Sequence, residues 1–406
     1  MNEETKDMPK VSSDMEAPKA LNYIEKLVAE LCPDGVEYVK LGDVTTSVQK
    51  IKWNEYPTQE FAYIDLSSIP TGGIEVKETS TISSYNAPSR AQQILRKNDV
   101  LFGVTRPLLK RVYKVSSEYD GQICSTGYLV LRANVNMILP GYIYHIIRVN
   151  NFYKYVEKHQ SGSAYPAISG SLVKEYIVPL PPIKVQNAIV EILDKFTKLE
   201  AELEAELAAR RAQYEYYRNS LFENLSGGGS EILGNLVKIK NGKSYKGFNS
   251  GDIPVYGSGG IMTYIDRSAY TGPSVLIPRK GSLGNIFYVD TPFWNVDTIF
   301  YTEINREQVT PKYLYHALQV QNLSELNTAG GVPSLTQTVL KRVRIPLPSL
   351  AEQECIVKIL DKFDALVNDI SSGLPAEIEA RRKQYEYYRD RLLTFPRASE
   401  ATEHKH

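Results

Sequence analysis

The sequence ARRAQYEYYR, which starts at Ala209, occurs a second time as ARRKQYEYYR, which starts at Ala380. Each copy follows another shared segment: IVPLPPIKVQNAIVEILDKF ends at Phe196, and RIPLPSLAEQECIVKILDKF ends at Phe363. Both segments contain Pro-Leu-Pro, a Gln, an apolar stripe with helical spacing and Leu-Asp-Lys-Phe, in that order. A repeat of this length indicates that the chain consists of two related halves.

The repeat extends into less similar sequence on the N-terminal side of each helical segment. PGYIYHIIRVNNF, from Pro140, is similar to PKYLYHALQVQNL, from Pro311. SAYPAISGSLVKEYIVP, from Ser163, is similar to GGVPSLTQTVLKRVRIP, from Gly330. The halves also open alike, with VKLGDV and EILGNL, but they diverge strongly in between. Two different inserts in a constant frame indicate one assembly role and two separate recognition tasks.

Composition excludes several classes of protein. A length of 406 residues suggests two to four domains, each large enough to bury a core. Cys32, Cys124 and Cys355 lie far apart, and no Cys/His spacing of a metal site occurs, so neither a disulfide framework nor a bound metal is expected. No signal peptide and no apolar run of membrane-spanning length is present, so we expect a cytoplasmic chain without membrane contact.

The net charge of zero hides an uneven distribution of charge. Residues 39–178 contain 16 Lys/Arg against 11 Asp/Glu, and residues 231–345 contain 12 against 8. The helical segments and the tails are therefore acidic, and the two modules are basic. Basic modules on an acidic frame are typical of proteins that touch phosphates through the modules alone. Ordinary scatter of surface charge is the alternative explanation.

The pattern predicts an α+β fold in which two strand-rich modules are joined by two long helices. Apolar residues recur with i, i+3/i+4 spacing over both helical segments, which favours an antiparallel coiled coil with a pseudo-two-fold internal repeat. Gly373 and Pro375 are expected to kink or restart the second helix. The predicted parts are a disordered tail (1–18), an N-terminal helix (19–36), the first module (37–182), the first helix (183–225), the second module (226–349), the second helix (350–395) and a disordered tail (396–406).

No convincing catalytic motif occurs in the sequence. A base-methylation motif and a Walker motif are both missing. His145 and His316 occupy equivalent positions of the repeat, and no carboxylate, Cys or second His accompanies them at catalytic or ligand spacing. We therefore interpret both as structural histidines of a short helix, and we expect the chain not to be an enzyme by itself.

The arrangement resembles the specificity subunits of type I restriction–modification systems. The resemblance covers Lys19 to Phe395 and is carried by LVAELCPDGVEYVKLGDV at the start, by the two PLP…ILDKF segments and by the duplicated ARRxQYEYYR blocks. It implies two target-recognition domains that each read half of a bipartite site in double-stranded DNA. It also implies two helices that act as a spacer and hold two methyltransferase subunits.

Further partners and cofactors follow from the same resemblance. The methyltransferase subunits bind S-adenosylmethionine and methylate adenine, and restriction subunits, which join through them, use ATP and Mg²⁺. No cofactor is expected in this chain. Two other hypotheses stay open: a coiled-coil adaptor that binds proteins rather than DNA, and a self-sufficient nuclease or methyltransferase.

Candidate DNA contacts are loop residues with donors and acceptors for base edges and phosphates. In the first module they are Arg106, Lys110, Arg111, Ser161, Ser163 and Tyr165. In the second module they are Lys243, Lys246, Arg279, Lys280, Ser282 and Asn285. The duplicated blocks supply the residues expected partly to pack between the helices and partly to dock the methyltransferase: Arg210, Arg211, Tyr214, Tyr217, Arg381, Arg382, Tyr385 and Tyr388.

Overall fold

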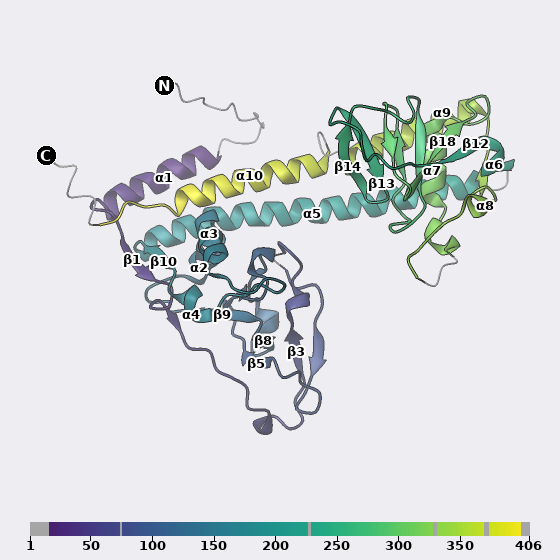
Figure 1. Cartoon of the computed structure of the whole chain (residues 1–406). Helices are drawn as coiled ribbons and strands as arrows, with labels where there is room; N and C mark the ends of the chain where they lie inside the picture. Colours follow the sequence, from purple (N-terminus) through teal and green to yellow (C-terminus); the bar gives the residue numbers. More distant parts are fainter. Residues whose placement is uncertain (1–15, 74, 226–228, 328–330, 369–372, 399–406) are drawn as a thin grey trace. The chain divides into compact units, whose positions relative to one another are not determined.

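The computed structural model describes residues 16–73, 75–225, 229–327, 331–368 and 373–398. Its contacts divide the chain into two compact units (Figure 1). The first unit contains residues 1–202 and 379–406, and the second contains residues 203–378. Each unit therefore combines one module with parts of both helical segments, so the module of one half packs against helical residues of the other.

The first unit contains two four-stranded sheets and a short ribbon. The ribbon pairs β1 (Glu37–Lys40) antiparallel with β10 (Ile177–Leu180). One sheet has the order β2-β9-β6-β7, with β2 Thr45–Thr46, β9 Tyr128–Ala133, β6 Val100–Gly103 and β7 Val112–Lys114. The other has the order β4-β3-β8-β5, with β4 Ser80–Ile82, β3 Phe61–Ile64, β8 Ile123–Ser125 and β5 Ala91–Ile94.

The second unit repeats this topology with one strand fewer, since its second sheet has three strands. Its ribbon pairs β11 (Ser230–Ile232) antiparallel with β19 (Arg344–Pro346). One sheet has the order β12-β18-β15-β16, with β12 Val237–Asn241, β18 Ile299–Ile304, β15 Ser274–Pro278 and β16 Phe287–Val289. The other has the order β14-β13-β17, with β14 Gly260–Ile265, β13 Ile253–Gly257 and β17 Trp294–Asn295.

The two modules share a topology despite their divergent sequences. In the first unit β3 pairs antiparallel with β4 and parallel with β8, and in the second β13 pairs antiparallel with β14 and parallel with β17. Both four-stranded sheets that lead to the helices connect their strands in the same relative order. The internal repeat therefore extends through the inserts, where the sequences retain little similarity.

The helices confirm the predicted mixed fold. The short helices of the first module are α2 (Pro140–Ile146), α3 (Asn150–His159) and α4 (Gly170–Lys174); those of the second are α6 (Leu233–Leu236), α7 (Pro311–Val320) and α8 (Gln337–Leu340). The first long helix is α5 (Ile183–Leu225). The second helical segment is described as α9 (Leu350–Asn368) and α10 (Leu374–Leu392). Gly373 lies directly before α10 and Pro375 at its second position, as expected for a restarted helix.

Sequence features at the start of each long helix explain its position. Ser349 and Glu352 form a capping box at the start of α9, since the Ser349 Oγ accepts from the Glu352 N–H and the Glu352 carboxylate accepts from the Ser349 N–H. The buried Gln186 accepts a hydrogen bond from the Leu139 N–H and donates to backbone carbonyls of residues 137 and 181. Gln353 makes the same three kinds of contact in the second unit. The Gln of the repeat therefore ties each helix to its own module.

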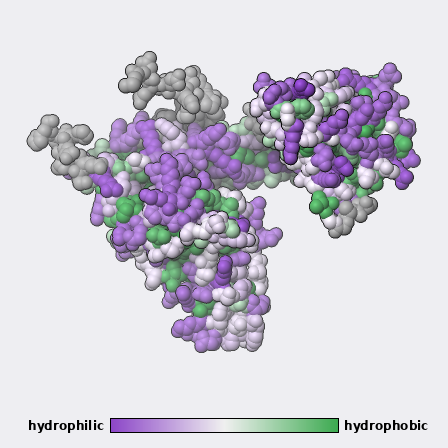
Figure 2. Space-filling model, viewed as in Figure 1, coloured by the Kyte–Doolittle hydropathy of each residue, from purple (hydrophilic) through white to green (hydrophobic). Residues whose placement is uncertain are grey.

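One core cluster of each unit lies between the module and the helices, and further clusters lie within the modules. In the first unit buried side chains of α2 and α3 pack with Leu193 of α5 and with Tyr385 and Leu392 of α10. In the second unit buried side chains of α7 pack with Tyr214 of α5 and Leu360 of α9. On the face shown in Figure 2, hydrophilic residues and residues of intermediate hydropathy make up most of the surface of each unit, and strongly hydrophobic residues are scattered among them.

The N-terminal helix and the last described residues belong to the first unit. Helix α1 covers Glu16–Leu31, and its Glu25 pairs with Arg391 of α10. The Val36 N–H donates to the Pro396 carbonyl over 3.0 Å, and the Ala398 N–H donates to the Val36 carbonyl over 3.1 Å. Residues 16–18 and 396–398, which the sequence analysis assigns to disordered tails, therefore form structure here. The rest of both predicted tails and residues 226–228, 371 and 372 lie outside the described residues.

Candidate nucleic-acid interface

The two helical segments pack antiparallel within each unit. In the first unit Phe196 of α5 stacks on Tyr388 of α10, with ring centroids 5.4 Å apart, and Glu200 pairs with Arg382. In the second unit Tyr217 of α5 lies 6.0 Å from the ring of Phe363 of α9. The Phe of each ILDKF segment therefore packs on the equivalent Tyr of the other half.

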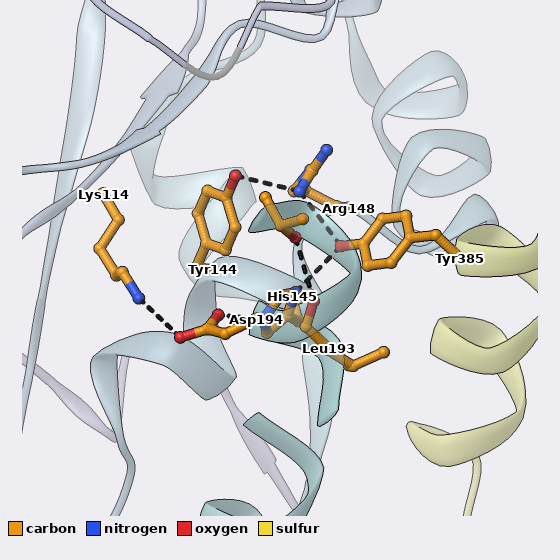
Figure 3. A network of polar contacts seen from close by, with 8 residues as sticks. Lys114, Tyr144, His145, Arg148, Leu193, Asp194 and Tyr385 are labelled. Atoms are coloured by element: carbon orange, nitrogen blue, oxygen red, sulfur yellow. Dashed lines mark hydrogen bonds and ion pairs between the residues drawn. The ribbon is translucent and has the colours of Figure 1, made fainter. Parts of the chain in front are cut away.

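A buried histidine joins module and helices in the first unit (Figure 3). The Nδ1 of His145 lies 2.9 Å from the hydroxyl of Tyr385, and its Nε2 lies 2.8 Å from a carboxylate oxygen of Asp194. Asp194 also pairs with Lys114. Arg148 donates to the hydroxyls of Tyr144 and Tyr385 over 3.0 and 3.1 Å. We call this set the first histidine node.

The second unit contains an equivalent node. The Nδ1 of His316 lies 3.2 Å from the hydroxyl of Tyr214, and its Nε2 lies 3.2 Å from a carboxylate oxygen of Asp361. Asp361 pairs with Lys312, as Asp194 pairs with Lys114. His145 and His316 are therefore structural, as predicted. Sequence spacing failed to reveal their carboxylate partners, because each partner lies on the helix that follows the module.

The environment keeps both imidazoles neutral. Burial lowers the pKa of His145 to about 4, although the hydrogen bond with Asp194 acts in the opposite direction. Burial also lowers the pKa of His316. Partial burial favours a raised pKa for Asp194, but the hydrogen bond from His145 and the charge of Lys114 outweigh it and hold that pKa below its usual range. A neutral His145 donates from Nε2 to Asp194 and accepts at Nδ1 from Tyr385.

The nodes show which of the duplicated tyrosines pack inside the units. Tyr214 and Tyr385 are each only 4% exposed, which agrees with their expected packing role, and their predicted docking of a partner stays a prediction. The side chains of Tyr216 and Tyr387, equivalent in the repeat, are 68% and 49% exposed instead. The sequence pattern QYEYYR could have indicated this, because residues i and i+2 of a helix face different directions.

The other predicted partner residues divide between packing and exposure. Arg210 is exposed and pairs with Glu206 on its own helix, whereas Arg211 donates to the Val367 carbonyl of α9. Arg381 donates to Gln384. Arg382, Tyr217 and Tyr388 take part in the helix contacts described above while keeping part of their surface accessible. Their docking role stays a prediction.

In the first module the structure brings together two predicted groups of DNA contacts. Residues Ser161 and Ala167 close a loop by two backbone hydrogen bonds of 2.8 Å, and the Arg106 N–H donates to the Pro166 carbonyl. The Arg106 guanidinium lies 4.4 Å from the ring centroid of Tyr165, which is 69% exposed. Ser161 and Ser163 are exposed on the same loop. An exposed cation, an aromatic ring and hydroxyls thus lie together on one edge of the first module, which we define by Arg106, Ser161, Ser163 and Tyr165.

Arg106 has an unusual backbone conformation. Its φ of 49° and the φ of 53° at Lys110 lie at either end of a short 3-10 turn, Pro107–Leu109. Left-handed conformations of residues other than glycine cost about 1–2 kcal/mol and concentrate at functional sites.

The side chain of Arg111 is partly engaged within the module. Its Nε donates to the Ile69 carbonyl over 2.8 Å, so part of its guanidinium fixes a loop.

In the second module the predicted residues surround one turn and one strand end. The Lys243 N–H donates to the Asn295 carbonyl, and the Asn285 side chain donates to the Ser258 carbonyl in the turn between β13 and β14. Lys280 pairs with Asp297 at 4.0 Å. Gly242 is required before Lys243, because a Cβ there would lie 2.0 Å from the Val296 carbonyl oxygen. Lys246 and Ser282 are exposed.

Equivalent backbone hydrogen bonds align this edge of the first module with the corresponding edge of the second. The alignment identifies edge residues of the second module that were not predicted from the sequence. The Gly281 N–H donates to the Pro333 carbonyl, as the Arg106 N–H donates to that of Pro166. Gly281 therefore occupies the position of Arg106, and its φ of 84° matches the left-handed backbone there. Val332, which is 70% exposed, stands where Tyr165 stands in the first module. The shared Pro of the repeat could have indicated this alignment.

The alignment and the contacts of Arg279 distinguish it from Arg106, and its predicted contact with DNA stays a prediction. Arg279 matches Val104, since their carbonyls accept equivalent hydrogen bonds from Leu335 and Ile168. Its guanidinium donates to the Asp297 carbonyl over 3.3 Å and lies 5.9 Å from the ring of Phe300. The side chain of Arg279 is half-buried, whereas that of the neighbouring Lys280 is exposed. The contacts of Arg279 therefore favour a role in holding the loop.

The described part of the chain contains no group of three or more His, Cys, Asp or Glu side chains that could hold a metal ion. None of its helices combines the length and apolar character needed to cross a bilayer.

Comparison with known proteins decides the family. The family model described as the type I restriction modification DNA specificity domain matches residues 33–209 and again residues 232–380. The chain belongs to this family. It is a specificity subunit: a non-catalytic component that recognises DNA sequence in a type I restriction–modification complex.

Individual relatives agree with the family model. The specificity subunit of a type I restriction enzyme from Escherichia coli is 30% identical over 93% of this chain and 98% of its own length. A putative specificity subunit from Haemophilus influenzae is 33% identical over 63% of this chain and 72% of its own length.

Solved structures confirm the fold. A structure of the type I restriction–modification system, from work on its assembly and conformational transition, matches with a TM-score of 0.59 and 24% identity, over 88% of this chain and 97% of the other. The crystal structure of a type I specificity subunit from M. genitalium matches with a TM-score of 0.55 and 17% identity, over 88% and 96% of the two chains.

Proposed function

We propose that this specificity subunit reads a bipartite target in double-stranded DNA, with one half-site recognised by each module. We further propose that its helices bind two methyltransferase subunits, through which restriction subunits join the complex. In this proposal S-adenosylmethionine binds to the methyltransferase for adenine methylation, ATP and Mg²⁺ bind to the restriction subunit, and this chain holds no cofactor. The complex then works in the cytoplasm.

The observation that carries the proposal is the repetition of one unit with two different edges. Both modules share a topology and both nodes share their hydrogen bonds, so the helices present similar surfaces twice. Similar surfaces favour two copies of one partner. The corresponding edges of the two modules differ in sequence, because Gly281 and Val332 occupy the positions of Arg106 and Tyr165. This difference favours two different half-sites.

Exchange of one module tests this division of labour. Residues 231–345 would be replaced by the corresponding module of another specificity subunit, and the methylated sequences would be mapped in a host that supplies the methyltransferase. We expect one half of the methylated site to change and the other to persist. Loss of the pattern in both halves, with the variant complex still assembled, would contradict the proposal.

Affinity for DNA separates this function from that of a coiled-coil adaptor. A specificity subunit in its complex should bind duplex DNA with an affinity that falls steeply as salt rises, because phosphate contacts release counterions. A protein adaptor would assemble with its partners and show no such DNA affinity.

A further inference from the structure

A pocket of about 280 Å³ lies beside the first histidine node, where the first module meets the helices. Its walls come from the loop at Thr71, the turn at Lys110, helix α3 and the two long helices. The lining residues are Thr71, Gly72, Lys110, Arg148, Tyr153, Glu200, Arg382, Tyr385, Glu386 and Arg389.

The cations of this pocket differ in whether a carboxylate compensates them. Arg382 pairs with Glu200, and Arg389 pairs with Asp390. Arg148 makes no ion pair with any described residue: it donates from one nitrogen to Tyr144 and Tyr385, which leaves its other donors for a ligand. Lys110 likewise has no ion pair in the described chain, and its ammonium lies 5.0 Å from the ring centroid of Tyr153.

The repeat provides an internal comparison for this pocket. A second pocket, of about 310 Å³, occupies the equivalent place in the second unit and is lined by Glu215, Arg218 and Gln319, which match Glu386, Arg389 and Arg148. There the Gln319 carbonyl accepts from Arg218 over 3.3 Å. The two pockets therefore share a frame, but the first has four cations and two carboxylates in its lining, and the second has one of each.

We infer that the pocket around Arg148 binds a phosphate group. A guanidinium presents paired donors that match two oxygens of a phosphate, and Lys110 adds a second positive charge to the same lining. Glu386 offsets only one of these two free cations. Lys110 and Arg106, a predicted DNA contact, lie at the two ends of the same turn. The phosphate can therefore come from the DNA backbone, in which case the inference rests on the proposed function, or from free phosphate.

The test uses the full-length chain and the variant Arg148→Gln, which copies the residue of the second pocket and is thus compatible with the frame. Thermal unfolding is measured in inorganic phosphate and in sodium chloride of equal ionic strength. At ten times its Kd, phosphate should raise the Tm of the parent by about 3 °C. The increase should disappear in Arg148→Gln and in Lys110→Gln, and it should persist in Lys195→Gln, a surface control on α5.

A DNA titration of the same variants identifies the source of the phosphate. If the backbone supplies it, Arg148→Gln should lower the slope of log affinity against log salt by about 0.9 on every sequence, with base preference unchanged. If free phosphate is the ligand, the slope should stay at the parental value and the phosphate effect should persist in the DNA complex. Failure of the parent to bind any DNA would reject the proposed function, while the unfolding measurement still reports on the pocket.

Two results would overturn the inference. One is a phosphate effect that is absent or equal in parent and Arg148→Gln, together with an unchanged salt slope. The other is loss of methyltransferase binding in Arg148→Gln with both phosphate measurements unchanged, which would assign the pocket to an acidic side chain of a protein partner.

Discussion

The hydroxyl of Tyr385 hydrogen-bonds to the Nδ1 of His145 across 2.9 Å, although 240 residues separate them in the sequence. Tyr214 and His316 repeat the relationship with the halves exchanged. Each module is therefore held by a tyrosine of the other half and by an aspartate of its own following helix. Tyr214 and Tyr385, which are equivalent in the duplicated QYEYYR blocks, supply these two hydroxyls.

Removing one hydroxyl should destabilise one unit only. Tyr385→Phe leaves the buried Nδ1 of His145 without its donor, so the first unit should lose about 1–3 kcal/mol of unfolding free energy. Tyr214→Phe is the matched change for the second unit. Hydrogen exchange of backbone amides should speed up in residues 128–160 for Tyr385→Phe and in residues 299–320 for Tyr214→Phe. Faster exchange in the opposite unit would show that the contacts are not reciprocal.

The buried histidines predict sensitivity to acid. With the pKa of His145 at about 4 in the folded chain and near 6.5 when unfolded, the unfolded chain binds more protons between these values. The free energy of unfolding should therefore fall as pH decreases from about 6.5 to 4, by up to about 1.4 kcal/mol per pH unit for each such histidine. Urea midpoints across this range measure the slope.

Substitution of both histidines provides the control for this pH dependence. His145→Gln should reduce the slope, and the double variant with His316→Gln should reduce it further, whatever its stability at pH 7. A double variant with the parental slope would place the acid sensitivity in other groups.

Substitutions of a base-contacting arginine and of a phosphate-contacting lysine should affect DNA binding in different ways. Arg106→Ala should weaken binding by about 1–3 kcal/mol and relax one base position, if its guanidinium contacts a guanine. Lys246→Ala should weaken binding to all sequences and lower the salt slope by about 0.9, if its ammonium contacts a phosphate. Titrations with matched and mismatched duplexes at several salt concentrations distinguish the two. Parental binding by both variants would mean that another face reads the DNA.

Arg279 serves as a comparison for Arg106. Its contacts with Asp297 and Phe300 predict that Arg279→Ala lowers the thermal stability of the second unit more than it changes base preference. A relaxed base position without loss of stability would instead support the predicted DNA contact of Arg279.

The exposed tyrosines of the helices should each support one methyltransferase subunit. Tyr216→Ala and Tyr387→Ala should each weaken one of two partner sites, by about 2 kcal/mol if the ring is a central contact. Native mass spectrometry of the reconstituted complex should show two partners on the parent, mainly one on each single variant and few on the double variant. A parent that saturates with one partner would contradict the stoichiometry itself.

Much of the frame could be predicted from the sequence. Helical spacing identified α5 and the restarted second segment, and the repeat established the equivalence of His145 with His316. These features depend on local burial and turn preferences, which each stretch of sequence records. The family itself followed from the order of the repeated segments.

Tertiary structure alone decided which residues meet. Helical periodicity marks Tyr385 as buried but does not name His145 as its partner, because the contact depends on how the chain folds back over 240 residues. The match of Arg106 with Gly281 arose in the same way, from hydrogen bonds to Pro166 and Pro333 that hold both backbones at positive φ. The sequence by itself determined a duplicated helical frame. The long-range hydrogen bonds decided which face of that frame is buried and which loop residues of each module lie together.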